Sequence, residues 1–81
     1  MTSIQVKNEI FEVLIDMGLP AQALTQKASF QKDIGLDSLD FAELVLEFEL
    51  RFKVEIPILE MENVTTIQAA IGYLNQRLSN N

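Results

Sequence analysis

The residues 33–40, Asp-Ile-Gly-Leu-Asp-Ser-Leu-Asp, limit more than any other stretch what this chain can fold into. Gly35 lacks a Cβ atom and so permits a sharp chain reversal with a positive φ. Asp37 or Ser38 can then cap a helix, because their short side-chain oxygens accept hydrogen bonds from the free N–H groups of the first turn. Acidic side chains on both sides of the serine lie where the helix dipole favours negative charge. The stretch therefore predicts a turn followed by a helix from about Ser38 to Phe52.

This predicted helix carries apolar residues on two roughly opposite arcs, at about 100° per residue. The first arc consists of Phe41, Leu44, Val45, Phe48 and Phe52. The second arc consists of Leu39, Ala42, Leu46 and Leu50. A small domain rarely buries both arcs of one helix, so we expect the aromatic arc to face the core. The second arc is then an exposed apolar stripe edged by acids, which is typical of an interaction site. The alternative is that it packs under a loop or another helix.

The N-terminal region predicts a helix followed by a long connection. Thr2 and Gln5 have the spacing of a capping box, so a helix is expected to begin at Ser3. Gly18 is expected to end it, and residues 18–37 then form a connection with a helical turn near its start. Apolar side chains are expected to anchor this connection: Leu19, Leu24, Phe30, Ile34 and Leu36. Connections of this length in small domains are usually functional or mobile.

The C-terminal region predicts two further helices. Pro57 can open a short helix over residues 58–62. Thr65 and Gln68 again have capping-box spacing, ahead of a fourth helix. The core stripe of that helix is Ile67, Ala70, Ile71, Leu74 and Leu78. The polar residues 79–81 are expected to fray.

These elements, with no alternating strand pattern, predict an all-α fold: a four-helix bundle with a short third helix and a long loop between helices one and two. The 81 residues make one small domain, residues 1–81, with a modest core. No apolar run approaches a membrane span, and the N-terminus lacks the features of a signal peptide. We therefore expect a cytoplasmic protein, and a monomer.

The charge is uneven and excludes several functions. Nine of the twelve acidic residues lie within residues 33–62, in a chain of net charge −6. An acidic face argues against nucleic-acid binding and favours basic partners, although it also serves simply as a solvated surface. The chain has no histidine and no cysteine, so no nucleophile–base pair or thiolate is available and we expect neither an enzyme nor a metal site.

Four separated motifs resemble the acyl carrier protein family. They are residues 33–40, Glu43-Leu44-Val45, Glu55-Ile56-Pro57 and the sequence Val-Thr-Thr-Ile-Gln-Ala-Ala-Ile at 64–71. The match runs from about residue 30 to residue 74, in the family's order and spacing. The resemblance implies that Ser38 carries a 4′-phosphopantetheine arm, whose thiol holds acyl groups as thioesters. It implies a carrier for fatty acid or polyketide-type biosynthesis. Met1 and the short polar tail lead us to expect a free-standing protein.

The resemblance also implies two surfaces. A phosphopantetheinyl transferase and acyl-processing enzymes with basic docking patches are expected to contact Asp37, Leu39, Asp40, Glu43, Leu46, Glu47 and Leu50. An acyl pocket is expected among Phe41, Leu44, Val45, Phe48, Ile56 and Ile71.

Phe41 departs from the family pattern, where this position is usually small or β-branched. A phenyl ring there predicts either short or polar cargo or an acyl chain displaced to a different gap, unless the ring only seals the core. Apolar Ile58 and Leu59 follow Pro57 where the family often has acids, which predicts an altered docking surface.

A second hypothesis from a different class is a non-covalent acidic helical adaptor. It would use the stripe that contains Leu39 and Leu46, and Ser38 would only cap the helix.

Overall fold

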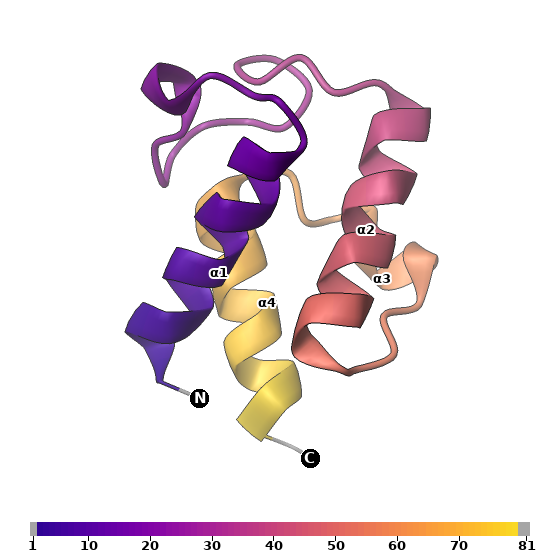
Figure 1. Ribbon diagram of the computed structural model, residues 1–81. Helices are drawn as coiled ribbons and strands as arrows, with labels where there is room; N and C mark the ends of the chain where they lie inside the picture. The colour runs from indigo at the N-terminus through magenta and orange to yellow at the C-terminus, as the bar shows by residue number, and fades with distance from the viewer. Residues whose placement is uncertain (1, 80–81) are drawn as a thin grey trace.

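The computed structural model describes residues 2–79, and over this range the chain forms a bundle of four helices (Figure 1). They are α1 (Ser3–Asp16), α2 (Ser38–Phe52), α3 (Ile58–Met61) and α4 (Ile67–Ser79), with a 3₁₀ turn, η1 (Ala21–Ala23), in the long loop. Helix α1 packs against both α2 and α4, and the short α3 packs against α2. The predicted all-α bundle with a short third helix is confirmed. Asn80 and Asn81, for which fraying was expected, lie outside the described residues.

The ends of α1 follow the predicted signals. The Gln5 N–H donates to Thr2 Oγ1 at 3.2 Å, and the Thr2 N–H donates to Gln5 Oε1 at 2.8 Å, which completes the capping box. After the helix, Gly18 adopts a φ of +92°, a conformation that disfavours side chains with a Cβ. Both residue-level predictions for this helix are confirmed.

The predicted cap of α4 is wrong by one residue. The hydroxyl of Thr66, not of Thr65, accepts the N–H of Ala69 at 3.1 Å. The carbonyl of Thr65 is instead engaged by the long loop, through the N–H of Phe30 at 2.9 Å. The Gln68 N–H, also assigned to the predicted box, donates to a loop carbonyl at 2.7 Å. Tertiary hydrogen bonds with the loop therefore shift the start of the helix.

The long loop is held down rather than loose. Leu24, Phe30 and Leu36 are buried, as predicted, while Leu19 and Ile34 are partly buried against the core. The loop also pairs with the start of α4, because the Ile67 N–H donates to a loop carbonyl at 3.1 Å. The segment that leads to α2 is therefore fixed on both its apolar and its polar sides.

Helix α2 buries the predicted arc. Phe48 and Leu44 are fully buried, and the other members of the aromatic arc are buried or partly buried: Val45, Phe52 and Phe41. The opposite stripe is exposed, with 68% of Leu39, 59% of Leu46 and 72% of Leu50 accessible to solvent. The fourth residue of the stripe, Ala42, is partly buried.

Arg51 joins α2 to α1 by three ion pairs. Its guanidinium lies 3.3 Å from the Glu9 carboxylate and 3.6 Å from that of Glu12, and it also pairs with Asp16. Hydrogen bonds to Asp16 and then to Glu9 raise the pKa of Arg51 above its ordinary value. These contacts supplement the apolar interface between the two helices with a polar clamp at its edge.

Candidate functional site at the start of helix α2

Asp37 is the residue that caps α2. Its carboxylate accepts the Asp40 N–H at 2.8 Å, and the Asp40 carboxylate accepts the Asp37 N–H at 3.4 Å. The sequence left the choice of cap open between Asp37 and Ser38. In the structure Asp37 is the N-cap of α2. The capping role that the adaptor hypothesis assigned to Ser38 is therefore wrong.

Ser38 is the first residue of α2 and its side chain is exposed. No hydrogen bond within residues 2–79 engages its hydroxyl, so the oxygen is available to react. The backbone that leads into Ser38 is also fixed, because Gly35 makes the predicted chain reversal with a φ of +84°. The N–H of Leu36 then donates to the Phe30 carbonyl at 2.8 Å. A free hydroxyl is thus held on a rigid turn.

The loop before this turn is closed by Asp33. Its carboxylate accepts the Ser29 N–H at 2.7 Å, and its own N–H donates to the Ser29 carbonyl at 3.1 Å. This acid therefore has a structural use in the loop, separate from the acids that surround Ser38.

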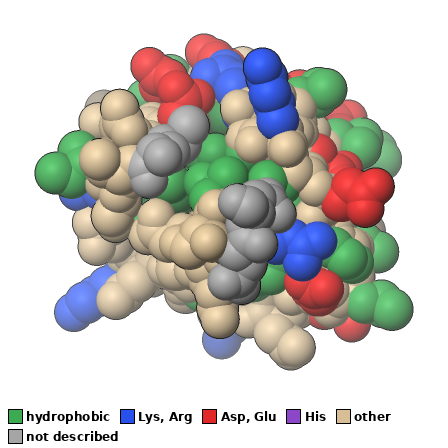
Figure 2. Space-filling view, turned by 90° about the horizontal axis from the view of Figure 1, so that it is seen from below, with side chains coloured by type: hydrophobic (Ala, Val, Ile, Leu, Met, Phe, Trp, Pro, Cys, Tyr) green, Lys and Arg blue, Asp and Glu red, His purple; other side chains and the backbone are tan. Residues whose placement is uncertain are grey.

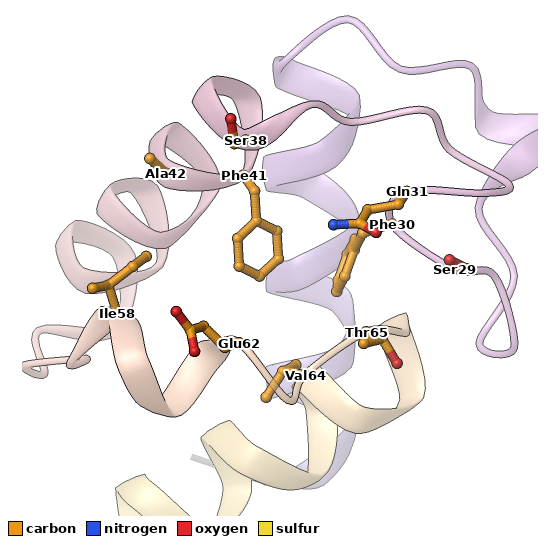
Figure 3. A pocket seen from close by; sticks show the side chains of 10 residues that line it. All are labelled: Ser29, Phe30, Gln31, Ser38, Phe41, Ala42, Ile58, Glu62, Val64 and Thr65. Atoms are coloured by element: carbon orange, nitrogen blue, oxygen red, sulfur yellow. The ribbon is translucent and has the colours of Figure 1, made fainter.

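A cavity of about 280 Å³ lies beside Ser38, between α2, α3 and the long loop (Figure 3). Its lining consists of Ser29, Phe30, Gln31, Ser38, Phe41, Ala42, Ile58, Glu62, Val64 and Thr65. Figure 3 shows the ring of Phe41 projecting from α2 toward α3 and the segment after it, where Ile58, Glu62 and Val64 lie. A substituent on Ser38 would start at the edge of this cavity.

The cavity differs from the pocket expected from the sequence. Of the expected pocket residues, only Phe41 lines it. The next four pack into the closed core: Leu44, Val45, Phe48 and Ile56. Ile71 is partly buried and borders a separate shallow hollow between α1 and α4. The sequence did not assign Ile58, Glu62 or Val64 to a pocket, although apolar Ile58 directly after the proline was a usable signal.

The expected partner surface is on the outside of the bundle. Asp37, Leu39, Glu43, Leu46 and Leu50 are exposed, and Asp40 and Glu47 are partly exposed. Helix α3 extends this surface with Ile58 and Leu59, which are 49% and 71% exposed. On the side where α2 and α3 lie, acidic and hydrophobic side chains alternate at the surface (Figure 2).

The outer side of α3 is tied to α4. The Tyr73 hydroxyl donates to the Glu60 carboxylate at 2.6 Å, and the Arg77 guanidinium lies 3.7 Å from the same carboxylate. Arg77 also donates to the Glu55 carbonyl at 3.0 Å. Burial, followed by the hydrogen bond to Glu60, raises the pKa of Tyr73 to about 12. These contacts hold in place the short helix that forms one wall of the cavity.

Within the described part of the chain, no group of three or more acidic, histidine or cysteine side chains is placed to hold a metal ion. Across residues 2–79, no helix combines the length and the apolar composition needed to cross a membrane.

Comparisons with known proteins identify relatives of this chain. Residues 9–74 match a family model described as the phosphopantetheine attachment site. The chain is also 36% identical over 75 residues to an acyl carrier protein from Chlorobium phaeobacteroides. That alignment covers 91% of this chain and 96% of the relative. Ser38, the turn before it and the adjoining cavity all lie inside the matched range.

Proposed function

The chain belongs to the acyl carrier protein family, and we propose that Ser38 is the residue to which its 4′-phosphopantetheine group is attached. As an acyl carrier protein, it carries acyl groups as thioesters on this prosthetic group. In the proposed attachment, the Ser38 oxygen forms a bond to the phosphorus of coenzyme A that bears the pantetheine. The pyrophosphate bond breaks, adenosine 3′,5′-bisphosphate leaves, and a base of the transferase takes the serine proton.

One observation carries this assignment. Ser38 is an exposed serine in the first turn of a helix whose cap is supplied by its neighbour Asp37. Its hydroxyl is therefore not needed for the fold, yet its position is fixed by the rigid turn at Gly35. A carrier needs no catalytic base of its own, because the transferase supplies it.

The cavity between α2 and α3 is the place we assign to the acyl group. It begins at Ser38, where the arm would start, and its walls carry the apolar side chains of Phe30, Phe41 and Ile58. Burying a methylene group in such surroundings contributes about 0.8 kcal/mol. None of the other expected pocket residues lines this cavity: Leu44, Val45, Phe48 and Ile56 lie in the buried core, and Ile71 borders the separate hollow.

The partners we propose are a phosphopantetheinyl transferase and acyl-processing enzymes that present basic patches. The exposed stripe of Leu39, Leu46 and Leu50 supplies apolar contact, and the carboxylates of Glu43 and Glu47 attract the basic patch over distance. We further propose that the protein acts as a cytoplasmic monomer in fatty acid or polyketide-type synthesis. Light scattering of the purified protein would check its oligomeric state.

Intact-mass measurement tests the attachment site. The apo protein is incubated with coenzyme A and a broad-specificity phosphopantetheinyl transferase, together with Ser38→Ala and Ser29→Ala variants. Ser29 is the matched control, because it lines the same cavity but lies in the loop. The native protein and Ser29→Ala should each gain one phosphopantetheinyl group, while Ser38→Ala should gain none and keep its helical circular dichroism.

Two results would contradict the proposal. A full mass gain by Ser38→Ala would place the attachment elsewhere. If the native protein gained no mass while the transferase modified another carrier, the non-covalent adaptor would become the better account.

A further inference from the structure

An aromatic pair lines the cavity. The ring centroids of Phe30 and Phe41 lie 5.7 Å apart with the rings inclined at 59°, a favourable tilted arrangement. Phe30 is almost completely buried, and both residues line the cavity. Two fully buried residues of the same helix, Leu44 and Phe48, do not line it. A straight acyl chain that enters beside Ser38 therefore meets two phenyl rings before it reaches the core.

The cavity is mainly apolar, but exposed and half-exposed polar side chains also contribute to its walls. Ser29, Gln31, Glu62 and Thr65 all contribute to the lining. Figure 3 shows the carboxylate of Glu62 on the α3 side of the cavity, across from the ring of Phe41. A purely alkyl cargo would cover these groups without replacing their hydrogen bonds to water, and that is unfavourable.

Glu62 differs from the other acid at this end of α3. Glu60 is engaged by Tyr73 and Arg77 on the outer side of the helix. No hydrogen bond or ion pair among residues 2–79 engages the side chain of Glu62. Since it also lines the cavity, its carboxylate is free to accept a hydrogen bond from a bound group. Hydrogen bonds to an ionised carboxylate are stronger than those between neutral groups.

From these features we propose that the preferred cargo of this carrier is a short acyl group bearing a hydrogen-bond donor. The proposal rests on the proposed attachment of the arm at Ser38. Phe30 and Phe41 limit the length of the chain, and Glu62 accepts the donor, which is a hydroxyl or an ammonium group near the thioester. The phenyl pair thus sets the chain length of the cargo, and Glu62 sets its polarity.

The test loads the protein with four cargoes through acyl-coenzyme A substrates of a broad-specificity transferase. The cargoes are butyryl, 3-hydroxybutyryl, 3-aminobutyryl and dodecanoyl groups. Intact mass confirms loading, and the melting temperature of each loaded form is compared with that of the same variant bearing only the arm. Taking this difference within each variant removes the effect of the substitution on the stability of the fold itself.

In the native protein, at least one of the two donor-bearing groups should raise the melting temperature above that of the butyryl form, by roughly 2–4 °C. The response to the hydroxyl and to the ammonium form decides which donor is accepted. The dodecanoyl group should stabilise the protein no more than the butyryl group. In Phe41→Ala the dodecanoyl form should become the more stable of these two, because the chain can fill the space left by the ring.

Glu62→Met removes the acceptor while keeping the length of the side chain. It should abolish the difference between the donor-bearing and butyryl forms. Glu55→Met is the matched control, since Glu55 is an exposed acid outside the cavity, and it should keep that difference.

Three outcomes would overturn the inference on cargo alone. They are greater stabilisation of the native protein by dodecanoyl than by butyryl, the absence of any effect of either donor, and a donor effect that survives in Glu62→Met. Failure of all four cargoes to load would instead overturn the proposed function, and the inference would fall with it.

Discussion

The two sides of α2 are built differently. The side that faces α1 is closed, with Leu44 and Phe48 fully buried and Arg51 paired to three carboxylates along α1. The side that faces α3 is open, because it borders a cavity of about 280 Å³ whose far wall is a helix of four residues. Helix α2 thus packs tightly on one side and borders a cavity behind a short helix on the other.

This difference explains how one helix meets two conflicting demands. If Ser38 carries the arm, as proposed, it must be held in a constant position for several enzymes, and the packed interface with α1 provides that rigidity. An acyl group also needs a region of the protein that can part at small cost, and segments with few buried contacts open most easily. The short α3 has a single fully buried side chain, Met61, and is otherwise held by the polar contacts of Glu60, so it meets this second demand. The predictions below test this contrast, from the largest effect to the smallest.

Truncation should be far more costly on the closed side. Phe48→Ala should lower the free energy of unfolding by ~3–5 kcal/mol, because it leaves a cavity among fully buried neighbours. Ile58→Ala, on the open side, should cost below ~1 kcal/mol since about half of that side chain is already exposed. Urea unfolding measures both values. Equal costs would mean that the two sides are packed alike.

Arg51 should stabilise the closed side through its charge. Arg51→Met should lower the melting temperature because three carboxylates of α1 lose their common partner and repel one another. Arg51→Lys should be intermediate, since one ammonium group cannot reproduce the planar fork of hydrogen bonds. The loss should shrink as salt is added, because ions screen both attraction and repulsion. If Arg51→Met melted at the same temperature as the native protein, the ion pairs of Arg51 would not stabilise the packing of α2 on α1.

On the open side, Tyr73 and Arg77 hold α3 to α4 through the carboxylate of Glu60. This contact can be followed through Tyr73, because it is the only tyrosine in the chain. An absorbance titration of the folded protein should give a pKa of about 12 for its hydroxyl. Glu60→Gln should lower this pKa, because it removes the negative charge that holds the proton. An ordinary tyrosine pKa in the native protein would show that the hydrogen bond from Tyr73 to Glu60 is not formed in solution.

The same group makes a signed contribution to the pH dependence of stability. The folded state holds the Tyr73 proton more tightly than the unfolded state, so the contribution is complete below about pH 10 and is lost as pH rises toward 12. Tyr73→Phe should therefore show a shallower fall in stability across that window. Denaturant midpoints at a series of alkaline pH values measure the slopes, and parallel slopes would contradict the assignment.

The smallest effect should come from the crowding of acids between residues 33 and 62. Moderate salt or a divalent cation should raise the melting temperature slightly, because screening reduces repulsion among these side chains. The rise should be larger in Arg51→Met, which has no attraction at that position for the salt to weaken. Calorimetry at several salt concentrations would show this, and a melting temperature that stays flat or falls would count against the idea.

Much of the fold could be predicted from the sequence because the signals are local. The spacing of apolar residues identified the two arcs of α2, and the capping box at Thr2 and the turns at Gly18 and Gly35 depend on neighbouring residues only. The start of α4 could not be predicted to the residue, because the loop competes for the Thr65 carbonyl. That hydrogen bond joins segments far apart in the sequence.

The candidate site shows the same limit. Ser38 and its turn were identified from one contiguous motif, whereas the cavity depends on how α3 and the loop rest on α2. Phe41 lies at the boundary between the core arc and the cavity, so helical periodicity assigned it to the same set as Phe48. Periodicity gives the direction of a side chain around its own helix, but it does not show where the neighbouring helix leaves a space.

The central claim is that cargo enters on the α3 side of α2 while the α1 side stays closed. Methyl chemical shifts, compared between the protein bearing only the arm and the same protein loaded with a 3-hydroxybutyryl group, test this claim most directly. The methyl signals of Ile58 and Val64, which line the cavity, should move, while those of Ile10 and Val13, buried on α1, should stay in place. Larger shifts at Ile10 and Val13 than at Ile58 and Val64 would contradict it.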